Sequence, residues 1–436
     1  MGVRRLVLAL VAGVAVAAGS TVLIAPSGEA AVACSSVTWR EGPAYTAGQQ
    51  VTYDAHLYQA LVTHTAYAGT GWNPAATPTL WKDLGACTGG TTPTTPPTTT
   101  PPTTTPPPTT TPPTTTPPPT GCATRGRPAG KVLQGYWENW DGASNGVHPG
   151  MGWIPINDSR ITQHGYNVLM AAFPVIRSDG TVLWENGMDA GVKVPTAAEI
   201  CAAKAAGATV LMSIGGATAG VDLSSSAVAD RFVSTIVPIL KQYNFDGIDI
   251  DIETGLTGSG SITTLSTSQA NLIRIIDGVL AQMPSNFGLT MAPETAYVTG
   301  GSVTYGSIWG SYLPIIKKYL DNGRLWWLNM QYYNGSMYGC SGDSYAAGTV
   351  QGFTVQTQCL NNGLTIQGTT IRIPYDKQVP GLPAQPGAGG GYMTPALVTQ
   401  AYNSVPSIKG LMTWSINWDG AKSWTFGDNV KRLQGR

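Results

Sequence analysis

The sequence predicts two folded domains of different classes: a small all-β module, and after it an α/β domain that closes as a (β/α)8 barrel. Three observations predict this arrangement. Residues 91–120 are only Thr and Pro, a composition that gives an extended spacer and cannot build a core. From residue 122 to residue 436, short apolar runs alternate with helical patterns, as in parallel α/β folds. One of these runs carries acidic side chains on a single face.

The N-terminal residues 1–33 have the pattern of an export signal. Arg4 and Arg5 precede an apolar stretch, and Ala31-Val32-Ala33 offers the small residues of a cleavage site. The arginine pair is compatible with both the general secretory and the twin-arginine route, and both remain open. No other run is long and apolar enough to span a bilayer. We therefore expect a secreted, extracellular protein with no membrane attachment after cleavage.

Residues 34–87 are predicted to form the all-β module. About fifty residues bury little surface, so a disulfide is expected to staple the fold. The runs 50–53 and 56–60 alternate in polarity and are predicted to be strands. Residues 88–121 then form the linker. It contains the Thr/Pro spacer, which would span about 90 Å if fully extended.

The chain has six cysteines, and an even number in an exported chain predicts disulfides. Cys34 and Cys87 bracket the module, Cys340 and Cys359 bracket one loop, and Cys122–Cys201 is the remaining pair.

Composition and spacing also exclude several kinds of site. The four His residues show no ligand spacing, so no metal or other cofactor is expected. The net charge is zero and no basic run exists, which argues against a nucleic-acid partner. The Gly-rich stretch 387–391 has no strand–helix context, so it is predicted to be a loop and not a phosphate site.

Eight apolar runs predict the strands of the barrel, and amphipathic stretches between them predict its helices. The strands are expected at 132–137, 167–173, 209–214, 247–252, 288–293, 325–333, 378–383 and 410–415, with helical patterns at 228–243, 268–283 and 394–403. The carboxyl ends of the strands in such a barrel form the active face.

The acidic strand is the most informative segment of the chain. Side chains alternate faces along a strand, so Asp249, Asp251 and Glu253 share one face, roughly 6–7 Å apart. Like charges this close raise at least one pKa, and a carboxylic acid that stays protonated near neutral pH can act as a general acid. A solvated acidic face or a calcium loop fits less well, because Ile fills every gap. Asp246 has the opposite parity and is expected to cap the strand.

The eight residues 246–253, D-G-I-D-I-D-I-E, resemble the signature of the family 18 glycoside hydrolases, the chitinase family. Other strand ends are similar to the companion motifs of that family, and the form at 330–334 is closest to its plant and bacterial branch. These motifs are Tyr136-Trp137, Ser213-Ile-Gly215-Gly216, Met291-Ala-Pro-Glu294, Met330-Gln-Tyr-Tyr-Asn334 and Met412-Thr-Trp414. Residues 34–87 resemble the chitin-binding modules of carbohydrate-binding families 5 and 12, through Trp39, Tyr45, Tyr53, Tyr58 and Trp81 among others.

The resemblance implies a role for each candidate catalytic residue. Glu253 would be the general acid, Asp251 would hold the substrate's acetamido N–H, and Asp249 would tune Asp251. Tyr333 would align the acetamido oxygen, and Trp414 would form the floor beneath the distorted sugar. The further residues expected to bind substrate are Gln331, Asn334 and Tyr136 in the barrel and Tyr67 and Trp72 in the module, where Leu61-Val62 occupies the place of a frequent Trp pair.

We therefore expect a monomeric endo-chitinase that acts on chitin and chito-oligosaccharides with retention of configuration. The endo preference rests on residues 384–409, which leave room for only a loop and a helix where deep-cleft relatives carry an extra domain. Two rivals are an endo-β-N-acetylglucosaminidase that cuts N-glycan cores and a non-catalytic chitin lectin. The binding module argues against the first, and the presence of Glu253 argues against the second.

Overall fold

The computed structural model describes residues 32–33, 37–40, 43–46, 48–61, 64–66, 73–75, 81–88, 121–140, 142, 151–217 and 220–436. The chain divides into two compact units, Met1–Pro112 and Pro113–Arg436, which are described separately below. Most of the expected signal segment, the Thr/Pro spacer, Cys34, Tyr67 and Trp72 lie outside the described residues. Within the described ranges, no helix has the length and apolarity needed to cross a membrane.

The first unit contains only β-strands among its described residues. Its sheet has the order β1-β6-β4-β3, and β2 pairs with β5. The strands are β1 (Val32–Ala33), β2 (Ala44–Tyr45), β3 (Gln50–Tyr53), β4 (His56–Ala60), β5 (His64–Thr65) and β6 (Trp81–Thr88). β3 and β4 match the two predicted strands. Tyr45 meets Trp81 edge-to-face at 5.1 Å in a small aromatic core. β1 consists of residues that the predicted signal cleavage would remove.

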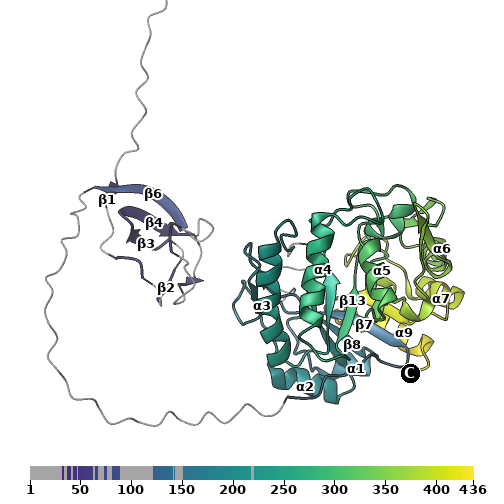
Figure 1. The fold of residues 1–436 in the computed structure, drawn as a ribbon. Coiled ribbons are helices and arrows are strands. Elements are labelled where there is room, and N and C mark those ends of the chain that lie inside the picture. The colour runs from purple at the N-terminus through teal and green to yellow at the C-terminus, as the bar shows by residue number, and fades with distance from the viewer. Residues whose placement is uncertain are drawn as a thin grey trace, which may run out of the picture. The chain divides into compact units, whose positions relative to one another are not determined.

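The second unit is a (β/α)8 barrel (Figure 1). Eight parallel strands have the order β14-β13-β12-β11-β8-β7-β20-β19. They are β7 (Val132–Glu138), β8 (Val168–Ala172), β11 (Thr209–Gly215), β12 (Gly247–Asp251), β13 (Gly288–Met291), β14 (Trp327–Leu328), β19 (Gly381–Pro383) and β20 (Gly410–Trp414). Parallel bridges pair Leu328 with Gln378 and Gln331 with Gly381. These bridges join the two outer strands, so the sheet closes as the sequence predicted.

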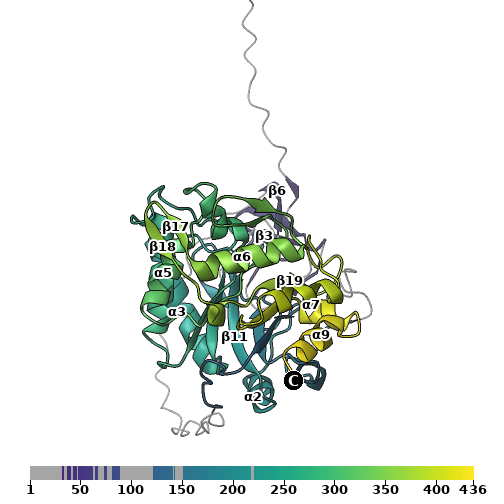
Figure 2. The same cartoon turned by 90° about the vertical axis from the view of Figure 1, so that its right-hand side faces the viewer.

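Helices cover the outside of the sheet (Figures 1 and 2). They are α1 (Ser159–Gln163), α2 (Ala197–Ala205), α3 (Ser226–Gln242), α4 (Thr267–Leu280), α5 (Leu313–Asp321), α6 (Val350–Asn362), α7 (Pro395–Ser404), α8 (Ile416–Gly420) and α9 (Thr425–Leu433). Capping boxes begin α2 at Thr196 and α4 at Ser266. Between β19 and β20, α7 is the only helix. The segment between β19 and β20, which the structure describes throughout, therefore contains loops and one helix, as the sequence predicted, and no extra domain.

Short elements lie in the segments that connect the barrel strands and helices. They are β9 (Val175–Ile176), β10 (Val182–Leu183), β15 (Met337–Tyr338), β16 (Ser344–Tyr345), β17 (Leu364–Ile366), β18 (Thr369–Ile371), η2 (Thr295–Tyr297), η3 (Thr299–Ser302) and η4 (Tyr375–Lys377).

The sixth strand is shorter than the sequence predicted. A strand was expected over 325–333, and only Trp327–Leu328 forms one. Beyond Leu328 the pairing is reduced to isolated bridges of Gln331 with Glu294 and Gly381. The N–H groups of Asn329 and Gln331 donate to Met291 and Pro293, and the N–H of Tyr332 donates to Gly381 on the other side. The segment therefore stays bonded to both neighbours without extending the regular strand.

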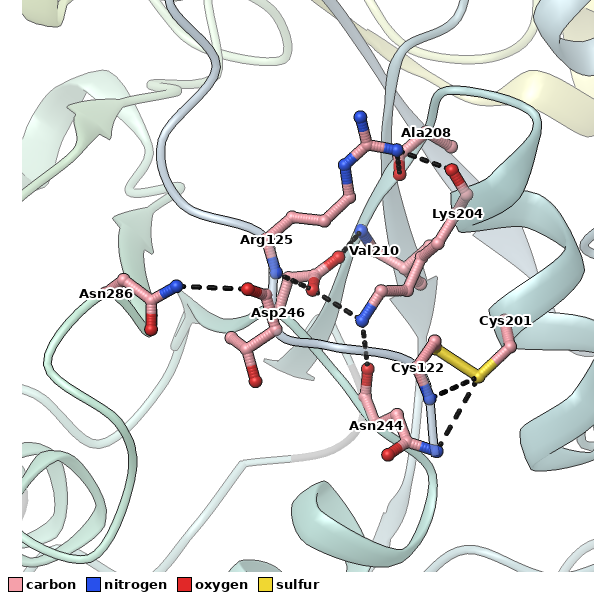
Figure 3. A network of polar contacts seen from close by, with 10 residues as sticks. Cys122, Arg125, Cys201, Lys204, Ala208, Val210, Asn244, Asp246 and Asn286 are labelled. Atoms are coloured by element: carbon pink, nitrogen blue, oxygen red, sulfur yellow. Dashed lines mark hydrogen bonds and ion pairs between the residues drawn. A yellow bond between two sulfur atoms is a disulfide. The ribbon is translucent and has the colours of Figure 1, made fainter. Parts of the chain in front are cut away.

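The floor of the barrel is closed by residues 121–131, which we call the N-terminal strap. Asp246, just before β12, accepts hydrogen bonds from the N–H groups of Arg125 (2.6 Å) and Val210 (2.9 Å) and pairs with Lys204 Nζ at 2.7 Å (Figure 3). Both members of this ion pair are buried. Asp246 therefore has the capping role that its parity predicted.

Further bonds hold the strap in place. The Cys122–Cys201 disulfide ties it to α2, and Asn286 Nδ2 donates to Thr124 O at 3.0 Å (Figure 3). Lys409 Nζ donates to the carbonyl of Pro128 at 2.6 Å. The barrel's other disulfide joins Cys340 to Cys359. Both are pairs that the sequence analysis expected, while the third, Cys34–Cys87, includes Cys34, which the structure does not describe.

Candidate active site

Strand β12 turns its acidic face into the barrel and its Ile face toward the helices. Ile248, Ile250 and Ile252 are fully buried in the main hydrophobic core. Asp249 is fully buried on the opposite face, and Asp251 is 4% exposed. Glu253 follows two residues after the strand ends. The three carboxyl groups therefore lie one after another along the strand direction, from the barrel interior to its carboxyl-terminal mouth.

Asp249 is held by four donors, which come from its two neighbouring strands, from β7 and from the residue after β14. They are Tyr136 Oη at 2.7 Å, Ser213 Oγ at 2.8 Å, Thr290 Oγ1 at 2.6 Å and Asn329 Nδ2 at 3.1 Å. Burial raises the pKa of Asp249, and these hydrogen bonds oppose that rise because they favour the charged form. Tyr136 was expected to bind substrate. The structure instead places its hydroxyl on Asp249, beneath the cavity that the other candidates line.

Gln331 connects the other two carboxyl groups. Its Nε2 lies 3.0 Å from Asp251 Oδ1 and 2.9 Å from Glu253 Oε1, and it also donates to the carbonyl of Ala292 at 3.1 Å. Burial raises the pKa of Glu253, and the Gln331 amide opposes this rise. The pKa of Asp251 is raised well above its ordinary value by burial and then by the charges of Glu253 and Asp249. The expected substrate residue Gln331 is therefore also a proton-tuning group.

A cavity of about 270 Å³ opens above these carboxyl groups. It is lined by Phe173, Gly216, Ala217, Asp251, Glu253, Glu294, Gln331, Tyr333, Asn334, Ala388 and Trp414. Burial and the neighbouring charge of Asp251 raise the pKa of Tyr333 well above its ordinary value, so its hydroxyl keeps its proton and can donate a hydrogen bond.

One wall of the cavity is aromatic. Trp414 stacks against Phe173, with ring centroids 6.0 Å apart and planes at 14°. Trp140 lies against both rings, at 6.4 Å from Phe173 and 6.1 Å from Trp414. Trp414 is among the residues predicted from the sequence, whereas Phe173 and Trp140 are not. Their signal was an aromatic residue at or just beyond the carboxyl end of a predicted strand.

The glycine pair at the end of β11, Gly215 in the strand and Gly216 just after it, allows close contact with the acidic strand, as predicted. Gly215 and Gly216 have positive φ, of 112° and 82°. A Cβ at Gly215 would lie 2.1 Å from the carbonyl oxygen of Asp251, and the N–H of Gly216 donates to that oxygen at 2.7 Å. Any larger residue at 215 would therefore displace the strand that carries the carboxyl groups.

A fourth carboxyl group lies in the cavity. Glu294 follows β13, and burial followed by repulsion from Glu253 raises its pKa. Glu294 is not among the site residues predicted from the sequence, although its place at the end of Met291-Ala-Pro-Glu294 indicates a position at the mouth of the barrel. Despite these carboxyl groups, the described residues contain no group of three or more His, Cys, Asp or Glu side chains arranged to hold a metal ion.

Comparison with known proteins agrees with this geometry. Residues 132–335 match the glycosyl hydrolases family 18, and residues 38–82 match the carbohydrate-binding module family 5/12. The chain is 83% identical over 309 residues to "Endochitinase 37" of Trichoderma harzianum, covering 71% of this chain and 92% of that protein. It is 30% identical to "Chitinase D" of Niallia circulans, over 88% of this chain and 89% of that protein.

Solved structures show the same relationship. A family GH18 chitinase from Chromobacterium violaceum aligns with a TM-score of 0.60 at 31% identity, over 93% of this chain and 100% of that chain. With a relative of 83% identity and an acidic strand at the mouth of a closed barrel, the chain belongs to glycosyl hydrolase family 18.

Proposed function

We propose that the protein is a secreted endo-chitinase that cuts β-1,4 links between N-acetylglucosamine units with retention of configuration. The observation that carries the proposal is the cavity itself, in which Asp251, Glu253, Tyr333 and Trp414 meet above the buried Asp249. The names of the relatives support the substrate class, since several are called endochitinases or chitinases.

In this mechanism the substrate supplies its own nucleophile. Glu253 protonates the glycosidic oxygen while the 2-acetamido carbonyl oxygen attacks the anomeric carbon and forms an oxazolinium ion. Asp251 accepts a hydrogen bond from the acetamido N–H and offsets the positive charge. Tyr333 donates to the acetamido oxygen and aligns it, and Trp414 supports the sugar from below. Water then attacks the anomeric carbon and opens the oxazolinium ring, with Glu253 as base. Because the anomeric carbon undergoes two displacements, the product keeps the original configuration.

The proton arrangement supports these roles. Burial raises the pKa of Glu253, so the acid form is retained toward neutral pH, as a general acid needs. Asp249 accepts four hydrogen bonds, which favour its charged form against the cost of burial. Asp251 stands between two negative neighbours, which favours a proton shared with Asp249 in the resting enzyme.

The wider organisation follows from the same proposal. We assign residues 1–33 to a signal peptide, 34–87 to a chitin-binding module, 88–121 to a linker and 122–436 to the catalytic barrel, acting as an extracellular monomer on chitin and chito-oligosaccharides. The endo preference is supported by the single helix α7 between β19 and β20, which leaves the mouth of the barrel without an added wall. Within the module, Tyr67 and Trp72 remain the proposed sugar platform.

The test is hydrolysis of the N-acetylglucosamine pentamer by the wild type and by Glu253→Gln, with the product anomers resolved by NMR. We expect initial β-anomers from the wild type and almost no turnover from the variant, which keeps the shape of the side chain and loses the acid. Release of disaccharide only from chain ends of the polymer would contradict the endo assignment. Binding without cleavage by the wild type would favour a lectin, and cleavage of N-glycan cores alone would favour the endo-β-N-acetylglucosaminidase.

A further inference from the structure

Asn334 lies beside the catalytic candidates, but its backbone conformation and its hydrogen bonds point to a second role, in holding a neighbouring loop. It follows Tyr333 directly, and its φ is 62°, in the left-handed region that Asn tolerates better than most residues. Its N–H donates to the carbonyl oxygen of Gly390 at 2.8 Å, and its Oδ1 accepts from the N–H of Gly390 at 2.8 Å. One residue thus holds both polar backbone groups of Gly390, in a pattern that resembles one rung of a sheet.

The loop that Asn334 holds lies against Tyr333. A Cβ at Gly389 would lie 3.2 Å from Cδ2 of Tyr333, closer than an ordinary van der Waals contact. Next to it, Ala388 lines the cavity that contains Asp251 and Glu253. The loop therefore passes the Tyr333 ring with no room for a side chain at residue 389, and it forms part of the wall of the cavity.

The ends of the same loop are packed as closely as its middle. A Cβ at Gly391 would lie 2.5 Å from Cβ of Ala347, and one at Gly387 would lie 3.3 Å from the ring of Trp418. The Gly-rich stretch therefore serves close packing on three sides. Asn334 is the residue that joins this packed loop, by hydrogen bonds, to the segment that carries Tyr333.

We propose that Asn334 is a positioning residue, which clamps loop 387–391 through Gly390 and so fixes the Tyr333 ring for catalysis. This differs from the substrate contact expected from the sequence. It rests on the proposed function, because it matters for turnover only if the Tyr333 hydroxyl aligns the acetamido group. The clamp uses the Oδ1 acceptor of Asn334. With Oδ1 occupied in this way, a hydrogen bond to the sugar would use the Nδ2 donor, so the two roles can be separated by substitution.

Three variants of the full chain separate the roles. Asn334→Gly keeps the left-handed backbone and the backbone N–H bond to Gly390 but removes the side-chain bond of the clamp, so kcat on the N-acetylglucosamine pentamer should fall about fivefold, the effect of one ordinary hydrogen bond. Asn334→Asp keeps the Oδ acceptor and loses the Nδ2 donor. Compared at the pH optimum of each protein, it should lose clearly less kcat than Asn334→Gly does. Gly389→Ala should lower kcat with the clamp intact, because its methyl group presses on the Tyr333 ring.

A double-mutant cycle with Tyr333→Phe gives the readout that a merely structural role would not move. If Asn334 acts through the Tyr333 hydroxyl, Asn334→Gly should change kcat by less than about twofold when it is added to the Tyr333→Phe variant. Thermal melting of each variant confirms that it is folded. A full additive loss in the double mutant would overturn the proposal and leave the proposed function standing, as would an Asn334→Asp variant as impaired as Asn334→Gly. An unchanged kcat in Tyr333→Phe alone would instead overturn the role of Tyr333, and the inference with it.

Discussion

Replacing Gln331 by Met should move the pH profile of the enzyme toward alkaline pH. Met has nearly the length of Gln but no N–H, so the change removes the donor that lies 2.9 Å from Glu253 Oε1 and 3.0 Å from Asp251 Oδ1. A hydrogen bond to the charged form of an acid lowers its pKa, so its removal raises the pKa of both groups. The protonated form of Glu253 then persists to higher pH, and the ionisation of Asp251 is also delayed.

The size of the shift follows from the shared geometry. A hydrogen bond to a charged group is worth about 1.5–3 kcal/mol, and one pKa unit corresponds to about 1.4 kcal/mol. The Nε2 of Gln331 divides two hydrogens among three acceptors, including the carbonyl of Ala292. Each carboxyl group therefore loses roughly two-thirds of a full bond, about 1–2 kcal/mol, and both limbs of the kcat/KM profile should move up by about 0.7 to 1.4 units.

The assay is kcat/KM on the N-acetylglucosamine pentamer from acidic to alkaline pH. Gln378→Met is the matched control. Gln378 is also buried, but its Nε2 donates to the carbonyl groups of Thr357 and Ile373 and to no carboxylate. This control should leave both limbs in place, whatever its effect on stability. A Gln331→Met profile that stays in place, or moves toward acid, would refute the reasoning.

Three further predictions follow. Lys204→Met leaves the buried Asp246 without its ion-pair partner and should lower the free energy of unfolding, measured in urea, by about 3–5 kcal/mol. The control Lys241→Met, at an exposed position, should lower it by under about 0.5 kcal/mol. Equal losses in the two variants would contradict the role of the ion pair. Trp414→Ala removes the ring stacked on Phe173 and should lower kcat/KM for the pentamer by about tenfold or more, and an unchanged value would remove Trp414 from the sugar site. Deletion of residues 34–87 should lower activity on insoluble chitin far more than on soluble oligomers, and equal losses would argue against a binding role.

The parts of the fold that follow from local pattern were predictable. The alternation of Ile and acid over residues 247–253 gave the face of each side chain correctly, because a strand has a period of two whatever surrounds it. The sixth strand was predicted too long, since beyond Leu328 its pairing is reduced to isolated bridges of Gln331 with Glu294 and Gly381. Where regular pairing ends depends on the neighbouring strands, and the residue types at 325–333 do not encode it.

The candidate site was predictable in its residues and less so in their contacts. Strand ends identify Tyr136, Gln331 and Asn334, because all strand ends meet at one face. The sequence does not reveal that Tyr136 donates to Asp249 or that Asn334 binds Gly390. These partners lie 113 and 56 residues away along the chain. They meet only through the stagger of the strands and the path of a Gly-rich loop, which residue types alone do not encode.

The N-terminal strap sets the boundary of the catalytic domain as an independent folding unit. The family match begins at residue 132, where the first barrel strand starts. A fragment cut there would lose the partner of Cys201 and would uncover the buried pair of Asp246 and Lys204. It would also remove the carbonyl groups that Lys409 and Asn286 bind. The shortest autonomous barrel therefore begins ahead of Cys122, and any grafting of this domain onto another carrier should join it within the Thr/Pro segment.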